Sequence, residues 1–226
     1  EFMRAVELAE ELEVDTIVGF SGCPGDCPTS QYPNWVTCTW PDDFPKILEY
    51  QWEILVDYWQ KASAEAASHG IKKIAIEMHP GFCVYNPETM MKLREAVGPI
   101  MGANFDPSHL IWQQVNPVEA IRFLGEKGAI HHFHAKDTRI NKPDCDINGV
   151  LCTGSYGDIL TRPWVFRTIG YGSDVKAWKD MMSMLNAVGY DGIVSIEHED
   201  GLMSAREGLE KAVEFLKSII IKEKPG

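Results

Sequence analysis

Short apolar runs alternate with longer segments of helical periodicity along almost the whole chain. Two helical segments, 86–98 (NPETMMKLREAVG) and 116–128 (NPVEAIRFLGEKG), begin with Asn-Pro and end with glycine. Asparagine favours the N-cap of a helix, proline its first turn, and glycine the position after its end. Because the unit of strand, loop, helix and glycine repeats, we expect an α/β fold in which helices cover a parallel sheet.

The same pattern gives bounds for the other elements. Strands are predicted at 14–22, 71–80, 100–107, 129–137, 164–172 and 190–200. Helices are predicted at 3–13, 43–69, 86–98, 116–128, 174–189 and 203–220. Residues 138–161 are rich in Gly, Asp and Asn, so we expect an excursion or a small hairpin there.

Two features favour a closed barrel over an open, doubly wound sheet. No predicted strand is followed by a GxGxxG or Walker-type glycine loop. Acidic and histidine residues gather at the predicted C-terminal ends of strands, where a (β/α)8 barrel builds its active site. A complete barrel takes eight strands and about 250 residues. We therefore expect one TIM barrel domain over 1–226 with about six βα units, truncated at the N-terminus by two units.

The acidic composition narrows the choice of partners. The chain has 21 Lys and Arg against 33 Asp and Glu, which gives a net charge of −12. This charge repels nucleic acids and anionic membranes, so a small polar partner is favoured. No apolar run reaches the roughly 20 residues of a membrane span, and no secretory signal pattern is present. Six cysteines are not needed to stabilise a chain of this size, so we expect reduced thiols and a cytoplasmic location.

Four potential metal ligands stand at the ends of predicted strands: Glu77, Asp106, His134 and Glu197. Their separations of 29, 28 and 63 residues correspond to one, one and two βα units, with the strand at 164–172 stepped over in the last. Any one carboxylate at a strand end is more often a helix cap than a ligand. Four such residues at matching strand ends predict a metal site of three carboxylates and one imidazole. This ligand set suits Mn²⁺ first, then Mg²⁺, Co²⁺ or Zn²⁺.

Three histidines in the segment AIHHFHAKD compete for the role of ligand. Side chains alternate along a strand, so His132 and His134 share one face and His131 faces the helices. His134 is nearer the C-terminal end of the strand and is the predicted ligand. His132 is one layer deeper, where a residue that supports the ligands from behind or a core residue is expected.

These residues resemble the xylose isomerase-like TIM barrels over about residues 14–217. The most specific segments are DPSHL, HFHAKD, FRTIGYG and GYDGIVSIEHED. That family includes sugar phosphate isomerase/epimerase proteins, ketose 3-epimerases, inosose dehydratases and endonuclease IV. The resemblance implies a TIM barrel with one divalent metal ion held by the four residues just named.

The resemblance also implies roles for individual side chains. Glu77 and Glu197 would act as catalytic bases as well as ligands, and His109 and Arg139 would contact substrate oxygens. His109 can also polarise or protonate a carbonyl oxygen, which makes it a third catalytic candidate. The chain departs from the epimerases at Cys83, where they have a second carboxylate.

Further substrate contacts are predicted from position. His79 has the strand parity to face the same cavity as Glu77. Lys136 is either a polar contact or a solvated lysine at a strand end. The aromatic residues Trp112, Phe82 and Trp164 either wall the pocket or belong to the core.

The leading prediction is a metal-dependent isomerase or epimerase of a small sugar, polyol or sugar phosphate. It would remove a proton next to a metal-bound carbonyl. The alternatives are a lyase or dehydratase, including a C-glycoside-cleaving enzyme, an endonuclease IV-like phosphodiesterase, and a non-catalytic binding protein. Open edges at the strands 14–20 and 191–197 also predict a homo-oligomer, because unpaired strand edges favour association.

Overall fold

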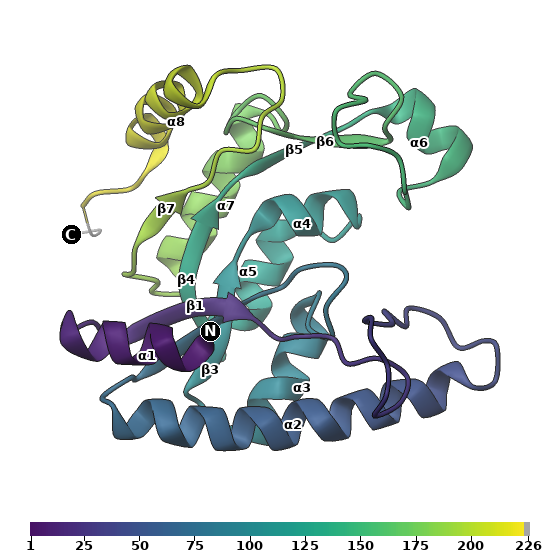
Figure 1. Cartoon of the computed structure of the whole chain (residues 1–226). Helices are drawn as coiled ribbons and strands as arrows, with labels where there is room; N and C mark the ends of the chain where they lie inside the picture. Colours follow the sequence, from purple (N-terminus) through teal and green to yellow (C-terminus); the bar gives the residue numbers. More distant parts are fainter. Residues whose placement is uncertain (224–226) are drawn as a thin grey trace. The chain divides into compact units, whose positions relative to one another are not determined.

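The computed structural model describes residues 1–223, which form two compact units (Figure 1). The first unit comprises 1–104 and 128–132, and the second comprises 105–127 and the chain from 133 onward. The boundary passes through two strands, so the prediction of one domain over 1–226 stays a prediction. Within residues 1–223, no helix combines the length and the apolar character that a membrane span requires.

The first unit carries a parallel sheet with helices on its faces. Its elements in chain order are α1 (Phe2–Glu11), β1 (Thr16–Phe20), α2 (Phe44–Ser68), β2 (Lys73–Glu77), α3 (Pro87–Val97) and β3 (Met101–Phe105). β1 pairs with β2, β2 pairs with β3, and β3 is followed in the sheet by the start of β4 (Ile130–Ala135). Figure 1 shows the long helix α2 in blue, with α3 among its neighbours. These elements lie where the sequence predicts them.

The predicted helix punctuation is visible at α3. The Asn86 side chain accepts a hydrogen bond from the Thr89 backbone N–H, while the Thr89 hydroxyl accepts one from the Asn86 N–H. Pro87 opens the helix, and Gly98 follows it with a φ of 131°. Strand β2 has Ile74, Ala75 and Ile76 fully buried, as expected for a parallel strand covered on both faces.

The second unit contains the rest of the parallel sheet and an antiparallel hairpin. Its elements are α4 (Pro107–Trp112), α5 (Pro117–Gly125), the end of β4, β5 (Asp137–Ile140), α6 (Lys142–Asn148), β6 (Trp164–Arg167), α7 (Val175–Ala187), β7 (Val194–Ile196) and α8 (Ala205–Ile219). β4 pairs in parallel with β7, with His134 opposite Ser195. β5 pairs antiparallel with β6.

The prediction that 164–172 forms a strand of the barrel sheet is wrong. β6 pairs with β5 in a separate two-stranded sheet, and β7 lies directly beside β4. Within residues 1–223 the parallel sheet therefore has five strands, not six. The segment WVFR is buried at all four positions, so its pattern does not distinguish a hairpin strand from a parallel one. The excursion or small hairpin expected at 138–161 comprises the end of β5 and the loop of this hairpin, which includes α6.

A buried aspartate organises the loop after β6. Asp137 accepts hydrogen bonds from the backbone N–H groups of Gly170, Gly172 and Ser173 and from the Trp178 indole. Burial raises the pKa of Asp137, and these donors partly offset the rise. A Cβ on Gly172 would lie 2.5 Å from the Thr138 carbonyl, so this position requires glycine. The segment TIGYGS is thus held around the aspartate of HAKD.

Candidate metal centre

Asp106 follows β3 and caps helix α4. Its Oδ1 accepts a hydrogen bond of 2.8 Å from the Ser108 backbone N–H. Its Oδ2 is buried and accepts no hydrogen bond from the described residues. A buried carboxylate oxygen without a donor has to be compensated by a cation. Oδ1 of Asp106 thus caps the helix, and Oδ2 is left to pair with a positive charge.

His134 and Glu197 meet across the pairing of β4 with β7. The Glu197 backbone N–H donates to the Ala135 carbonyl, which fixes Glu197 at the end of β7. His134 Nδ1 lies 3.4 Å from Glu197 Oε2. One ligand atom from each of Asp106, His134 and Glu197 lies within 4.8 Å of the other two. The second unit therefore brings three of the four predicted ligands together.

Lys136 lies at the centre of this group and not in solvent. Its side chain is 2% exposed, and its Nζ lies 2.7 Å from Glu197 Oε2, 2.9 Å from Glu199 Oε2 and 3.2 Å from Asp106 Oδ2. Burial lowers the pKa of Lys136, but the attraction of Asp106, Glu197 and Glu199 outweighs it and leaves the pKa above its ordinary value. The alternative of a solvated lysine is wrong.

Glu199 was not among the residues predicted from the sequence. Its carboxylate is about half exposed and contacts Lys136 of the site. The missed signal is the spacing, because Glu197 and Glu199 are two residues apart in the strand predicted at 190–200 and would share a face there.

His109 joins the same group from helix α4. It is buried, and its Nε2 lies 3.6 Å from Asp106 Oδ2 and 3.3 Å from Lys136 Nζ. Its ring packs edge-on against Phe166, with the ring centroids 5.2 Å apart. His109 thus lies beside the predicted ligand Asp106. A residue that binds a metal-bound substrate would need this position.

The other substrate contacts predicted in this unit lie elsewhere. Trp112 is 6% exposed and stacks on Trp164 at 4.6 Å in a buried cluster with Phe166. Core packing accounts for both tryptophans, and their contact with substrate stays a prediction. Arg139 is exposed on β5, and its role also stays a prediction.

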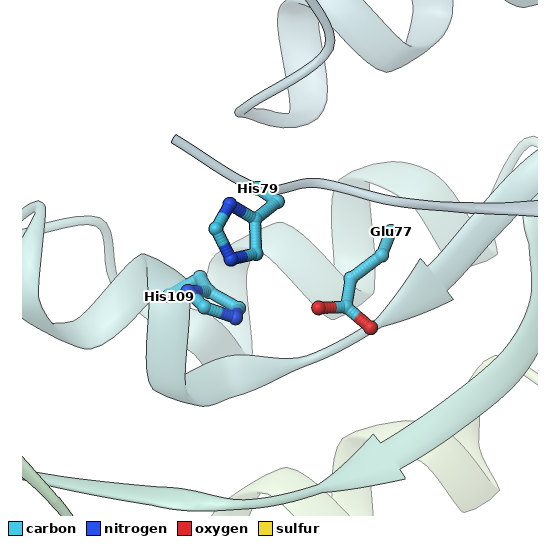
Figure 2. A group of neighbouring side chains, drawn as sticks. All are labelled: Glu77, His79 and His109. Carbon is cyan, nitrogen blue, oxygen red and sulfur yellow. The ribbon is translucent and has the colours of Figure 1, made fainter. Parts of the chain in front are cut away.

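The first unit supplies Glu77 and His79, which Figure 2 draws together with His109. Glu77 ends β2, is 5% exposed, and accepts a hydrogen bond of 2.9 Å from Asn104 Nδ2. A Glu77 carboxylate oxygen and a His79 ring nitrogen lie within 4.8 Å of each other, as their shared parity predicts. His79 Nδ1 lies 2.6 Å from the Pro80 carbonyl and donates to it, since a carbonyl only accepts.

The loop after His79 holds an aromatic cluster and a buried thiol. Phe82 stacks on Phe20 at 4.9 Å, and His79 packs edge-on against both rings. Cys83 is buried, and a hydrogen bond with the Cys23 thiol, followed by burial, raises its pKa above the ordinary range. The position where epimerases carry a second carboxylate therefore holds a neutral thiol.

His131 lies apart from these groups. Its Nε2 lies 3.3 Å from the Pro99 carbonyl, and Arg94 of α3 is among the charges that act on it. Burial, followed by the Arg94 charge, lowers the pKa of His131 to about 4. His131, which strand alternation places on the helix side of β4, is therefore neutral at pH 7.

The residues present fit a divalent cation. Asp106 Oδ2 is buried, accepts no hydrogen bond from the described residues and faces the Lys136 ammonium at 3.2 Å, so this oxygen has lone pairs to offer a cation. Two carboxylates with one imidazole form a donor set typical of Mn²⁺ or Mg²⁺. Asp106, His134 and Glu197 would hold it in the second unit.

Comparisons with known proteins agree on one fold family. A family model described as xylose isomerase-like TIM barrel matches residues 1–219. The uncharacterized protein YfiH of Bacillus subtilis (strain 168) is 43% identical over 220 residues, which cover 96% of this chain and 70% of that protein.

Solved structures at low identity share the fold. The probable 3-DHS dehydratase AsbF of Bacillus anthracis aligns with a TM-score of 0.65 at 16% identity, over 96% of this chain and 68% of that one. A xylose isomerase-like TIM barrel protein of Mycobacterium smegmatis, in complex with magnesium, gives 0.60 at 16% identity over 97% and 67%. D-Psicose 3-epimerase of Clostridium cellulolyticum H10, solved with D-tagatose, gives 0.60 at 13% identity over 97% and 69%.

Proposed function

The chain belongs to the xylose isomerase-like TIM barrel family, and we propose that it is a metal-dependent isomerase or epimerase of a small sugar, polyol or sugar phosphate. The observation that carries the proposal is the cluster of Asp106, His134 and Glu197 within 4.8 Å, with the donorless Oδ2 of Asp106 among its atoms. We also propose a cytoplasmic location and a homo-oligomer, on the sequence arguments given above.

Glu77 is proposed as the fourth ligand from the register of the sheet. Glu77 pairs with Asn104, and their side chains are hydrogen-bonded, so both lie on one face of the sheet. Asp106 follows Asn104 by two residues, and alternate residues of a strand share a face. This alternation along the chain is the basis for proposing Glu77 as a ligand beside Asp106. His132 and His134 are related in the same way on β4.

The chemistry follows from where the acidic and basic groups stand. A bound divalent ion supplies Lewis-acid polarisation of a substrate carbonyl and its neighbouring hydroxyl. Glu197 would take or return a proton, and Glu77 would do the same on the opposite face of the substrate. His109 donates to the carbonyl oxygen, while His79, Trp112 and Arg139 are proposed to orient the substrate.

A dehydratase or lyase is the second candidate, and Cys83 favours it. The neutral, buried Cys83 replaces the second carboxylate of the epimerases, so one of their groups is missing here. Elimination needs the same first proton abstraction, followed by loss of a leaving group. A phosphodiesterase is disfavoured by the net charge of −12, which repels nucleic acid. A non-catalytic binding protein remains the third candidate.

The test combines metal content with product analysis. Metal-free protein is reconstituted with Mn²⁺, Mg²⁺, Co²⁺ or Zn²⁺ and incubated in D₂O with a panel of ketoses, inososes and sugar phosphates. Solvent deuterium at the carbon next to the carbonyl, in an isomerised product, supports the proposal. A dehydrated product supports the second candidate. Binding of a panel member without turnover, or no binding of metal, contradicts both enzyme proposals.

A further inference from the structure

The Lys136 ammonium is buried within the ligand cluster of the second unit. The side chain is 2% exposed, and its Nζ is within 3.2 Å of carboxylate oxygens from Asp106, Glu197 and Glu199. It also lies 4.5 Å from the centre of the Phe166 ring. An ammonium has three N–H donors. Two of them are hydrogen-bonded to Glu197 and Glu199, and the third side of the group faces Asp106 and His109.

Two of the oxygens that contact Lys136 belong to proposed metal ligands. Asp106 Oδ2 and Glu197 Oε2 each face Lys136 Nζ, and both residues belong to the potential ligand set with His134. In enzymes with two metal ions, carboxylates commonly lie between the ions and are shared by them. Lys136 has the position and the charge sign that a second ion would have, on the side of Glu199.

We infer that Lys136 substitutes for a second cation and thereby limits this centre to one divalent ion. The inference rests on the proposed metal site and deepens it. Without the ammonium, three carboxylates would meet in one place, with Asp106 fully buried. Such a group either repels itself or binds another cation, because buried charges require compensation.

The same contacts bear on the role first predicted for Lys136. Because every side of the ammonium is occupied, a substrate oxygen would have to displace one of these partners to reach Nζ. Lys136 is thus a positioning residue that holds Glu197 in the cluster and Glu199 outside the ligand set. Glu199 is the most exposed of the three carboxylates, so its contact with Lys136 is the one most easily replaced by a contact with an ion.

The test is the Mn²⁺ stoichiometry of the wild type and three variants. K136M removes the charge but roughly keeps the length of the side chain, and K136R keeps the charge. K136M/E199Q removes one charge of each sign and so restores the balance. Each folded protein is dialysed against Mn²⁺ and analysed for metal, and EPR reports whether bound ions are magnetically coupled.

We expect about one ion in the wild type, K136R and K136M/E199Q, and about two coupled ions in K136M, as in two-metal sites. About one ion in K136M overturns the inference and leaves the proposed function intact. No ion in the wild type overturns the proposed function itself. If K136M folds only with Mn²⁺, a coupled pair in the refolded protein supports the inference. A K136M chain that stays unfolded in saturating Mn²⁺ overturns it, because a second cation should replace the missing charge.

Discussion

The predicted site residues of the two units are satisfied in different ways. In the first, Glu77 accepts a hydrogen bond from the neutral amide of Asn104, and His131 donates to the neutral carbonyl of Pro99. In the second, Asp106 and Glu197 are compensated by the ammonium of Lys136. A neutral partner fixes the orientation of a group without balancing its charge, whereas an ammonium does both. Exchanging charged for neutral groups should therefore affect the two units differently.

The largest effect is expected on turnover. E77Q and E197Q remove the proposed bases while roughly keeping their shape. Turnover of whichever panel compound the wild type converts should therefore fall by about 10² to 10⁴ fold. Deuterium exchange from D₂O should fall in parallel, because the same groups move the proton. Turnover that persists without solvent exchange in the wild type would indicate a hydride shift instead.

The two glutamine variants also test the comparison between the units. The new amide oxygen in E77Q can still accept from Asn104, so this variant should keep the stability of the wild type. E197Q removes a charge that faces Lys136, so its melting temperature should fall further. Metal content is measured in both, because glutamine is a poorer ligand than glutamate. Metal-replete variants with unchanged rates would remove both residues as bases.

Metal affinity is expected to separate two histidines of one strand. H134A removes a proposed ligand and should weaken Mn²⁺ binding by more than the roughly 10 to 100 fold typical of losing a mere supporting residue. H131A removes a side chain that lies beside Pro99 and should leave the affinity of the folded protein nearly unchanged. Equal losses in titration calorimetry would mean that the assignment of faces on β4 is wrong.

Much of the fold can be predicted from local sequence. The Asn-Pro starts of α3 and α5 and the glycine end of α3 are local signals, and the structure confirms them because capping involves neighbouring residues. α5 ends at Gly125, three residues before the glycine predicted to end it. The pairing of β6 is not local. It depends on β5, which follows β4 after a single residue, so HAKDTRI looks like one strand end followed by a loop.

The candidate site divides in the same way. Asp106, His134 and Glu197 are predictable because each ends a strand, and strand ends meet at one edge of a parallel sheet. The burial of Lys136 is not predictable from its neighbours. It depends on Glu197 and Glu199, which lie 61 and 63 residues further along the chain. Glu199 lies two residues after Glu197 within the strand predicted at 190–200, so strand alternation could have identified it.

A smaller effect is expected on stability when the neutral partner of Glu77 is removed. N104L deletes the amide that donates to Glu77 Oε2 and leaves the buried carboxylate without that donor. Hydrogen bonds to charged groups contribute about 1.5 to 3 kcal/mol, so the free energy of unfolding should fall by about that much. The control is N104L/E77Q, which has no charge at this position and should recover part of the loss. Urea denaturation that shows no recovery would contradict the role given to the amide.

The smallest effect is a dependence on pH that arises from His131. Burial and the Arg94 charge lower its pKa to about 4, from an ordinary value near 6.5. Between these two pH values the unfolded chain binds more protons at this position than the folded chain does. The stabilising contribution of neutral His131 is therefore present above pH 6.5 and is lost as the pH falls toward 4, by roughly 1 to 2 kcal/mol. H131Q keeps a donor for the Pro99 carbonyl but does not titrate, so its unfolding free energy should decline less over this range. The unfolding free energies of the wild type and H131Q are measured by urea denaturation at pH 7, 5.5 and 4.5. If both decline equally, His131 is not buried as a neutral group. The first unit would then also compensate a buried charge, as the second unit does.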